Sequence, residues 1–486
     1  MKKTFTGMPL YLLCVLFLLP SCGFIKEYGN TNPVRWGEKG VFEGKGVSYR
    51  DDELLIFYKQ PPTPESKKQI EQDIISNGVT VTEVRKCNDC DGYVELWKGS
   101  NIHTIVHGDG VKAGSGRGGS KGVGEDSLAR YSLNYINRLP VDITDGMPNP
   151  NNSKPASKTA VSGAGKDTIL IAVLDTGIDT LAWIGSNQLW VNPGEKKGGN
   201  DKDHNCYIDD INGWNFLSNT PNFHDDNMHG TLVSRYIMDE FTAASPHFVQ
   251  LMGLKTHDHT GSGDLFSTIC AIHYAVKKGA KIINASWGFY YYEDNPHPYL
   301  DSLITNICRS KGILFLAAAG NKIPQEDLLA KSIYQQRYGT TPSDAALRNL
   351  ALHNFYPANF SKADNNVITV TTTDGSQVSA TQNWNATYAS LAIKADVVTS
   401  THMKFLMPFA STTFEISGSS FATAIATGKI GAWLPLSAYA PGIDKETVFK
   451  KLTDGISDGS IPNFMQTSIQ LRTMGRIQAG RYTKRR

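Results

Sequence analysis

The stretch Thr168-Ile-Leu-Ile-Ala-Val-Leu-Asp-Thr-Gly177 decides the fold, because it is an unbroken apolar run that ends in a carboxylate and a glycine. Similar apolar, β-rich runs recur along the rest of the chain, with helix-like segments between them. Continuous apolar strands that alternate with helices predict an α/β fold, in which helices cover both faces of a parallel sheet. In such sheets, functional residues gather at the carboxyl ends of the strands. The predicted strands cover residues 169–174, 249–254, 281–284, 313–317 and 367–371, and the clearest helices cover residues 265–278 and 300–309.

Polar motifs stand at one such strand end and at two predicted helix starts. Asp175 ends the first apolar run, His229 opens a helix-like stretch, and Ser420 opens a helix whose following residues are mostly small. Taken singly, each has an ordinary explanation, since aspartates are common in turns and the chain has 12 histidines. Taken together, they predict a charge-assisted relay, in which the histidine removes the serine proton while the aspartate orients the ring and stabilises its cation.

The local sequences around these residues resemble the subtilisin-like serine proteases. Asp175-Thr-Gly-Ile resembles that family's D-T/S-G-I/V, and His229-Gly-Thr-Leu-Val resembles H-G-T-H-V with Leu232 in place of the second histidine. Gly418-Ser-Ser-Phe-Ala-Thr-Ala424 resembles G-T-S-M-A-T-P, and none of the departures removes a catalytic group. The resemblance covers about residues 168–480. It implies a subtilisin-like three-layer fold with a parallel central sheet. It also implies a serine endopeptidase that forms an acyl-enzyme and requires no cofactor for its chemistry.

The same resemblance implies a substrate cleft. Asn321, in Ala317-Ala-Ala-Gly-Asn321, would share an oxyanion hole with the backbone N–H of Ser420. A protein or peptide substrate would add as an extended strand between two edges of the fold. One edge would be Gly261, Ser262 and Gly263, the other would be Ser286, Trp287 and Gly288, and Ala318 and Gly320 would lie beside the oxyanion hole.

An acidic stretch lies between the aspartate and the histidine of the predicted relay. It is Asn200-Asp-Lys-Asp-His-Asn-Cys-Tyr-Ile-Asp-Asp210, and its alternating oxygen-bearing side chains suit Ca²⁺. The spacing resembles an EF-hand-type loop and an insert of some subtilisin-like enzymes, although Cys206 replaces the turn glycine and Asn212 replaces the bidentate glutamate. A solvated acidic loop is the alternative. The candidate ligands of a structural calcium ion are Asp201, Asp203, Asn205, Tyr207 and Asp209.

The amino-terminal residues predict a route to the cell envelope. Lys2 and Lys3 precede a short apolar run, which is typical of a secretory signal peptide and too short for a transmembrane helix. The run ends in Leu19-Pro-Ser-Cys-Gly23, which resembles a bacterial lipobox. We therefore expect a signal peptide over residues 1–21 and a lipid on Cys22 that tethers the protein to a bacterial envelope membrane, facing the periplasm or the outside. A plain signal peptide with a chance cysteine is the alternative.

The rest of the chain predicts a small front domain, a linker and a large peptidase domain. Residues 22–109 predict an α+β unit with strands at 54–58, 79–84 and 93–97 and a helix at 65–76. Residues 110–166 contain a glycine-rich run and an Asn- and Pro-rich run, so they predict an exposed linker before the peptidase domain at 167–486. The G-x-G-x-x-G that begins at Gly114 lacks the strand and helix of a nucleotide site.

The front domain has two interpretations. The family resemblance implies a prodomain, which would act as an intramolecular inhibitor, and whose removal would separate the protease from a lipid on Cys22. A permanent accessory domain is the alternative.

Composition limits the partners, and the motifs leave two other functions open. The chain has 486 residues with 40% hydrophobic side chains, enough for a large core, and its 48 basic against 46 acidic residues argue against a nucleic-acid partner. One alternative to a protease is a non-catalytic surface lipoprotein that binds peptides on the same fold. The other is an esterase, which the lack of a G-x-S-x-G elbow around Ser420 disfavours.

Seven cysteines are too few for a disulfide scaffold of this length. Removal of Cys14 with the signal peptide and lipidation of Cys22 leave five, so at least one should be a free thiol unless chains pair. We expect Cys87-Asn-Asp-Cys90 to close a small disulfide turn, and Cys270 and Cys308 to be small buried apolar residues.

Overall fold

The structure is a computed structural model, and it describes most of the chain from Tyr49 onward. The predicted signal peptide, Cys22, Cys90 and the glycine-rich run at 110–124 lie outside the described residues. Among the helices that are described, none combines the length and the apolar character needed to cross a bilayer. The described residues are 49–58, 61–76, 78–87, 93–100, 102, 105, 129–139, 142–143, 163–180, 187–291, 297–373, 378–393, 395, 403–406, 413–462 and 468–470.

The catalytic domain is built on a sheet with the strand order β18-β15-β14-β12-β10-β6-β8-β7. Neighbouring strands are parallel except β15 and β18, which are antiparallel. Each of the five predicted strands lies in this sheet, while β7, β15 and β18 were not predicted. The bounds are β6 (Asp167–Asp175), β7 (Gly213–Asn215), β8 (His247–Lys255), β10 (Ile282–Ala285), β12 (Leu314–Ala318), β14 (Val367–Thr372), β15 (Ala389–Ile393) and β18 (Ser468–Gln470).

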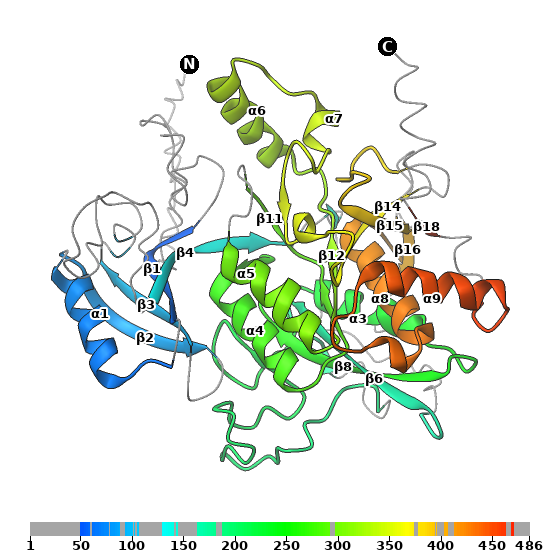
Figure 1. Ribbon diagram of the computed structural model, residues 1–486, viewed down its shortest axis with the longest axis horizontal. Helices are drawn as coiled ribbons and strands as arrows, with labels where there is room; N and C mark the ends of the chain where they lie inside the picture. Colours follow the sequence, from blue (N-terminus) through cyan, green and yellow to red (C-terminus); the bar gives the residue numbers. More distant parts are fainter. Residues whose placement is uncertain are drawn as a thin grey trace, which may run out of the picture.

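Helices cover both faces of this sheet (Figure 1). Alternate side chains of β6 show why: Ile171 and Val173 join one core with α3 (His229–Asp239), α8 (Ser419–Trp433) and α9 (Lys445–Ser457). Ala172 and Leu174 join the other core with α4 (Leu265–Lys277), α5 (Pro298–Ser302) and the π-helical η3 (Leu303–Cys308). The predicted three-layer α/β fold is confirmed. The remaining elements are α6 (Pro324–Tyr338), α7 (Asp344–Leu347), η4 (Ala358–Phe360), η5 (Leu436–Ala438), β11 (Phe289–Tyr290), β13 (Phe355–Tyr356), β16 (Met403–Leu406) and β17 (Thr413–Ser417).

The front domain contains every element predicted for it and one strand more. Its elements are β1 (Tyr49–Tyr58), α1 (Pro64–Ser76), β2 (Thr80–Cys87), β3 (Val94–Ser100) and β4 (Ala129–Arg138). Its antiparallel sheet has the order β2-β3-β1-β4-β9, and the last strand, β9 (Ser262–Asp264), belongs to the catalytic domain. In Figure 1, β4 leads from the front domain towards the catalytic domain.

The prediction that residues 110–166 are entirely linker is wrong, because β4 and the short β5 (Asp142–Ile143) lie within that range. Tyr131, Leu133 and Tyr135 alternate along β4 and are buried. The strand is paired on both sides, by β1 and by β9. Only the flanking glycine-rich and Asn- and Pro-rich runs have the composition of a linker.

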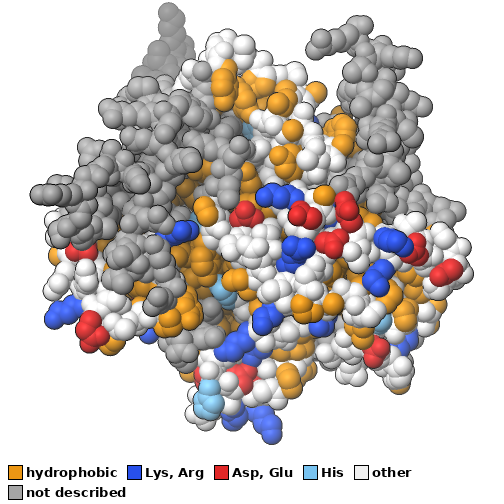
Figure 2. Space-filling view, viewed as in Figure 1, with side chains coloured by type: hydrophobic (Ala, Val, Ile, Leu, Met, Phe, Trp, Pro, Cys, Tyr) orange, Lys and Arg blue, Asp and Glu red, His pale blue; other side chains and the backbone are white. Residues whose placement is uncertain are grey.

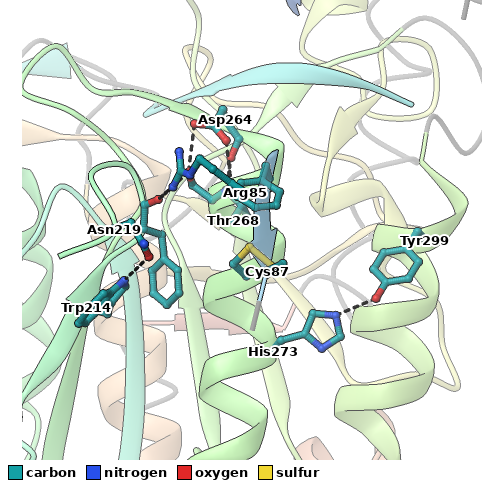
Figure 3. The surroundings of a disulfide bond; sticks show 12 residues. Arg85, Cys87, Trp214, Asn219, Asp264, Thr268, His273 and Tyr299 are labelled. Carbon is teal, nitrogen blue, oxygen red and sulfur yellow. Dashed lines mark hydrogen bonds between the residues drawn. A yellow bond between two sulfur atoms is a disulfide. The ribbon is translucent and has the colours of Figure 1, made fainter. Parts of the chain in front are cut away.

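The expected cysteine pairing is also wrong, because Cys87 at the end of β2 is disulfide-bonded to Cys270 in α4, 183 residues away. The bond links the front domain to the catalytic domain (Figure 3). Nearby, the Arg85 guanidinium donates to the backbone oxygens of Phe216 at 2.8 Å and Leu217 at 3.4 Å. A local C-x-x-C carries no information about a helix that packs against it from elsewhere in the chain.

The other described cysteines differ from one another. Cys206 is disulfide-bonded as well. Cys308 is a free, buried thiol, which agrees with the expectation for that residue, and burial raises its pKa. On the face drawn in Figure 2, basic and acidic side chains are interspersed.

Candidate active site

Asp175 and His229 form a buried pair where β6 meets α3. His229 Nδ1 lies 2.8 Å from Asp175 Oδ1, and the two residues are 1% and 0% exposed. The backbone N–H of Thr176 donates to the same carboxylate oxygen at 2.7 Å. Gly230 allows this approach, because a Cβ there would lie only 2.2 Å from the Gly177 carbonyl oxygen. The aspartate therefore holds one nitrogen of the ring, and Nε2 has no hydrogen-bond partner among the described residues.

Asp225 holds the loop that delivers His229, and sequence reasoning did not single it out. Its Oδ1 accepts hydrogen bonds from the Thr176 hydroxyl and from the backbone N–H groups of Asn227 and Met228, at 2.8–3.0 Å. Its Oδ2 accepts from the backbone N–H and hydroxyl of Thr231 at 2.8 and 2.7 Å. Asp225 is fully buried, so it is a positioning residue. Its only sequence signal was its place four residues before the histidine.

Ser420 lies in the first turn of α8. The ring of its neighbour Phe421 is 5.4 Å from the His229 ring, centroid to centroid. The Ser420 hydroxyl donates to the Ser286 backbone oxygen at 3.2 Å, and the Ser286 hydroxyl donates to the Ser420 backbone oxygen at 3.0 Å. The contact between Asp175 and His229 is thus formed. The Ser420 hydroxyl, in contrast, points to Ser286, just after β10, and not to the His229 ring. Catalytic hydrogen bonds often become well aligned only when substrate binds.

Asn321 lies against the start of α8. Its Oδ1 accepts from the backbone N–H and the hydroxyl of Ser419, both at 2.9 Å. Its Nδ2 would be 2.7 Å from a Cβ on Gly418, which has a φ of 132° that favours glycine. The amide oxygen is therefore fixed by Ser419, and the amide nitrogen lies next to the turn that precedes the serine. Gly320 belongs to the same network, because its N–H donates to the Ser419 hydroxyl at 3.0 Å.

A second histidine lies close to the relay. His257 is fully buried, and its Nδ1 lies 2.9 Å from the Thr256 hydroxyl. Burial, and then the nearby His229, lower the pKa of His257 to about 3, so this ring stays neutral at ordinary pH. Lys255, also buried, donates to the Thr176 backbone oxygen and to Asp226. The site therefore has a neutral imidazole and a paired ammonium beside the histidine of the relay.

The two predicted substrate edges lie on either side of β4. On one side, Asn137 pairs with Gly263 and Arg138 with Ser262, in antiparallel register. On the other side, Arg138 exchanges two backbone hydrogen bonds of 3.0 Å with Gly288. Leu139 N–H also donates to the Gly261 oxygen at 3.0 Å. Trp287, between Ser286 and Gly288, is fully buried, and Ala318 ends β12.

The segment that includes β4 continues to the strand that precedes Ser420. Three residues beyond Leu139, Asp142 in β5 pairs with Ser417 in β17, and Ile143 pairs with Ile416. Ser417 comes three residues before Ser420 in the sequence. One continuous segment therefore contacts the substrate edges at residues 137–139 and the approach to α8 at 142–143.

The acidic insert gathers a different set of carboxylates from the predicted one. Oxygens of Glu195, Asp203 and Asp210 all lie within 4.8 Å of one another. Of the five predicted ligands, only Asp203 belongs to this cluster. Asp201 instead accepts from the backbone N–H of Asn205 and Cys206, Asp209 accepts from Gly198 and Gly199, and the Asn205 amide oxygen accepts from the Tyr207 N–H.

Lys278 sets the electrostatics of this cluster. Its ammonium contacts Asp203 and lies 3.3 Å from Asp210. Burial raises the pKa of Asp210, and the hydrogen bond from Tyr274 does not cancel that effect. For Asp203, burial also acts upward, but hydrogen bonds from Lys278 and Asn192 hold the pKa below its usual value. Glu195 lies outside the alternating stretch, so periodicity could not reveal it.

Part of the chain is similar to known proteins. A model described as "Subtilase family" matches residues 166–448. The chain is 33% identical over 211 residues to "Subtilisin-like protease 1" of Plasmodium vivax, which is 41% of this chain and 30% of that relative. It is 33% identical over 118 residues to "Thermostable alkaline protease" of Halalkalibacterium halodurans, which is 22% of this chain and 30% of that relative. The chain thus spans less than a third of the length of these relatives.

Among solved structures, one similar chain is fervidolysin from Fervidobacterium pennivorans, described as a keratinolytic enzyme related to subtilisin. The alignment has a TM-score of 0.47 and 16% identity, and it covers 81% of this chain and 55% of that chain.

Proposed function

Because the chain belongs to the subtilase family, we propose that it is a serine endopeptidase whose relay is Asp175, His229 and Ser420. The observation that carries the proposal is the buried Asp175–His229 pair beside a cleft in which an extended strand is held by its backbone on both sides. A cleft of that kind suits a peptide substrate, since main-chain hydrogen bonds recognise an extended chain of almost any sequence.

The proposed reaction begins when the Ser420 hydroxyl leaves the Ser286 backbone oxygen and turns to His229. His229 Nε2 removes the Ser420 hydroxyl proton, and Oγ attacks the peptide carbonyl carbon. The oxyanion that forms accepts hydrogen bonds from Asn321 Nδ2 and the Ser420 N–H. The imidazolium then protonates the leaving amine, the C–N bond breaks, and water hydrolyses the acyl-enzyme by the same steps. Asp175 holds the ring through Nδ1 and stabilises the positive charge that develops on it.

A fluorophosphonate probe tests this function on the full chain. We expect Ser420 of the wild type to be labelled after processing and denatured protein to be cut, and Ser420→Ala to lose both activities. The matched control is Ser310→Ala, which removes an exposed serine hydroxyl outside the site and keeps the nucleophile. A wild type that is neither labelled nor proteolytic would support the non-catalytic peptide-binding alternative instead.

We propose that the front domain is an inhibitor and the first substrate of the same cleft. Its strand β4 takes the place of an extended peptide, and the chain passes from Leu139 at one side of the cleft to Asp142 beside Ser417. The bond cut during maturation should therefore lie between Leu139 and Asp142. Amino-terminal sequencing of the catalytic fragment tests this, and a first cut elsewhere in a chain with active Ser420 would contradict it.

A lipid on Cys22 and attachment to a bacterial envelope membrane remain part of the proposal. Their support is the lipobox-like sequence at the end of an apolar run. Metabolic labelling with a fatty acid should mark the wild type and not Cys22→Ala. Labelling of both proteins to the same extent would remove the lipid from the proposal.

A structural calcium ion is proposed for the acidic cluster. The donor set fits, because Glu195, Asp203 and Asp210 supply clustered carboxylate oxygens and Asp203 Oδ1 is buried without a hydrogen-bond partner among the described residues. Lys278 would have to share these oxygens with the ion or withdraw. Calcium at 100 times its dissociation constant should stabilise the fold by about 2.7 kcal/mol. Thermal unfolding with calcium and with a chelator should differ for the wild type and not for Asp210→Asn; no difference for the wild type contradicts the site.

A further inference from the structure

Asn137 in β4 lies in a small polar pocket at the start of α4. It is 1% exposed, and its Nδ2 donates a hydrogen bond to Thr268 Oγ1 at 2.9 Å. Thr268 is fully buried, and its own hydroxyl donates to the Asp264 backbone oxygen at 3.0 Å. Figure 3 labels Thr268 in the first turn of α4 and Asp264, the residue that caps this helix. Because the threonine proton is used within the helix, its oxygen offers Asn137 an acceptor. The pocket is thus suited to a hydrogen-bond donor.

Gly263 makes room for the amide. A Cβ at this position would lie 2.4 Å from Asn137 Oδ1 and 2.8 Å from a carbon of the His257 ring. Asn137 Oδ1 has no hydrogen-bond partner among the described residues. The amide nitrogen, and not the oxygen, is therefore the atom that the pocket recognises.

The neighbouring residues of the strand are held in a different way. Arg138 is exposed and bound through its backbone to Gly288, and Leu139 N–H is bound to the Gly261 oxygen. Such backbone contacts accept any sequence, so the selectivity of the cleft must come from buried side chains. A buried acceptor that loses its donor is costly, which makes the pocket at Thr268 a discriminating contact.

We propose that Gly263 and Thr268 form a specificity pocket that selects a hydrogen-bond-donating side chain, an amide above all, at the substrate position that Asn137 occupies. The proposal rests on the proposed protease function and names one of its sequence preferences. Asn137 would then be the preferred residue as it occurs in this chain's own front domain. It lies two positions before Leu139, and the chain runs on from Leu139 to Asp142.

Two peptides test this pocket with the enzyme that the full chain forms after the cut between Leu139 and Asp142. One has the sequence of residues 132–145, and its twin carries Leu in place of Asn137. We expect the wild type to cut the asparagine peptide with a kcat/KM about three- to tenfold higher, the value of one ordinary hydrogen bond. Thr268→Val should bring the ratio to about one or below, since valine keeps the shape and lacks the oxygen. Thr268→Ser should keep the preference, because it retains the hydroxyl.

The ratio between the two peptides separates recognition from folding, since a poorly folded variant would lose activity on both alike. A wild type that cuts both peptides equally, or a Thr268→Val enzyme that still prefers asparagine, overturns the pocket and leaves the protease function standing. A wild type that cuts neither peptide, nor any denatured protein, overturns the protease function and this preference with it.

Discussion

Strand β4 of the front domain and the loop that carries His229 satisfy their buried polar groups in different places. In the catalytic domain, Asp225 finds its described donors within that domain, at Thr176 after β6 and in the loop and helix around His229. In the front domain, two buried asparagines of β4 reach across to the catalytic domain: Asn134 contacts Asp264 as well as Glu53 of its own domain, and Asn137 contacts Thr268. A buried polar group that loses its partner is destabilising. The catalytic site should therefore survive separation of the two domains, whereas β4 is complete only when docked.

The largest effect is expected for a substitution of Asn321, which lies in the catalytic domain. In subtilisin, loss of one oxyanion-hole donor lowers kcat on the order of 10²–10³-fold. Asn321→Ala should lower kcat by a similar factor with little change in KM, because the oxyanion exists only after attack. Steady-state kinetics on a denatured protein measure both. Gln382→Ala is the matched control, since Gln382 also accepts a hydrogen bond from the Ser419 N–H and offers no oxyanion donor in this proposal. A rise in KM at constant kcat would place Asn321 in substrate binding instead.

The next effect concerns the covalent link between the domains. Cys87–Cys270 joins the front domain to α4, so a cut between Leu139 and Asp142 should not release the catalytic domain by itself. On denaturing electrophoresis, the cut wild type should run as one species without reductant and as two with it. The link should also contribute about 2–4 kcal/mol to unfolding.

Cys206 is disulfide-bonded too, so removing the Cys87–Cys270 bond alone leaves another disulfide in the protein. The most decisive variant therefore combines Cys206→Ser with Cys270→Ser. This double variant should separate into two fragments without reductant, and each single variant shows how much one bond contributes. Separation of the cut wild type in the absence of reductant would mean that the domains are not held covalently. Release from a lipid on Cys22 would then need only the cut.

The same contrast explains what the sequence could predict. The strand ending at Asp175 was predictable because a parallel strand buried on both faces must be continuously apolar. Motifs with fixed local spacing predicted the relay and Asn321. Strand β4 was missed because Asn134 and Asn137 interrupt its apolar pattern. The residues that they contact in the catalytic domain, Asp264 and Thr268, are more than 120 residues away in the sequence. Cys270 was missed for the same reason: the pairing depends on α4 packing against β2, which no local pattern reports.

Glu53 offers the smallest and most selective way to change the docking contact. It is buried in β1, where Lys98 Nζ lies 2.9 Å away, Arg50 Nε lies 3.7 Å away, and Asn134 bridges it to Asp264. Burial, and then the charge of Asp264, raise the pKa of Glu53 despite the two cations. The docked protein thus binds a proton more readily than an undocked one. Docking should be favoured at low pH and weaken as the pH rises from the usual glutamate range through the raised pKa.

Glu53→Gln should dock at least as well at neutral pH and lose this part of the pH dependence, because the amide keeps the shape and carries no charge. The measurement is the rate of fluorophosphonate labelling of Ser420 in the full chain from acid to neutral pH, since labelling requires that β4 leave the cleft. The wild-type rate should rise with pH by a few-fold more than that of the variant. Asp52→Asn, an exposed neighbour on the same strand, is the control for the change of charge alone. If the rates of wild type and Glu53→Gln keep a constant ratio at every pH, Glu53 does not couple protonation to docking, and the difference between the two domains lies in their uncharged contacts.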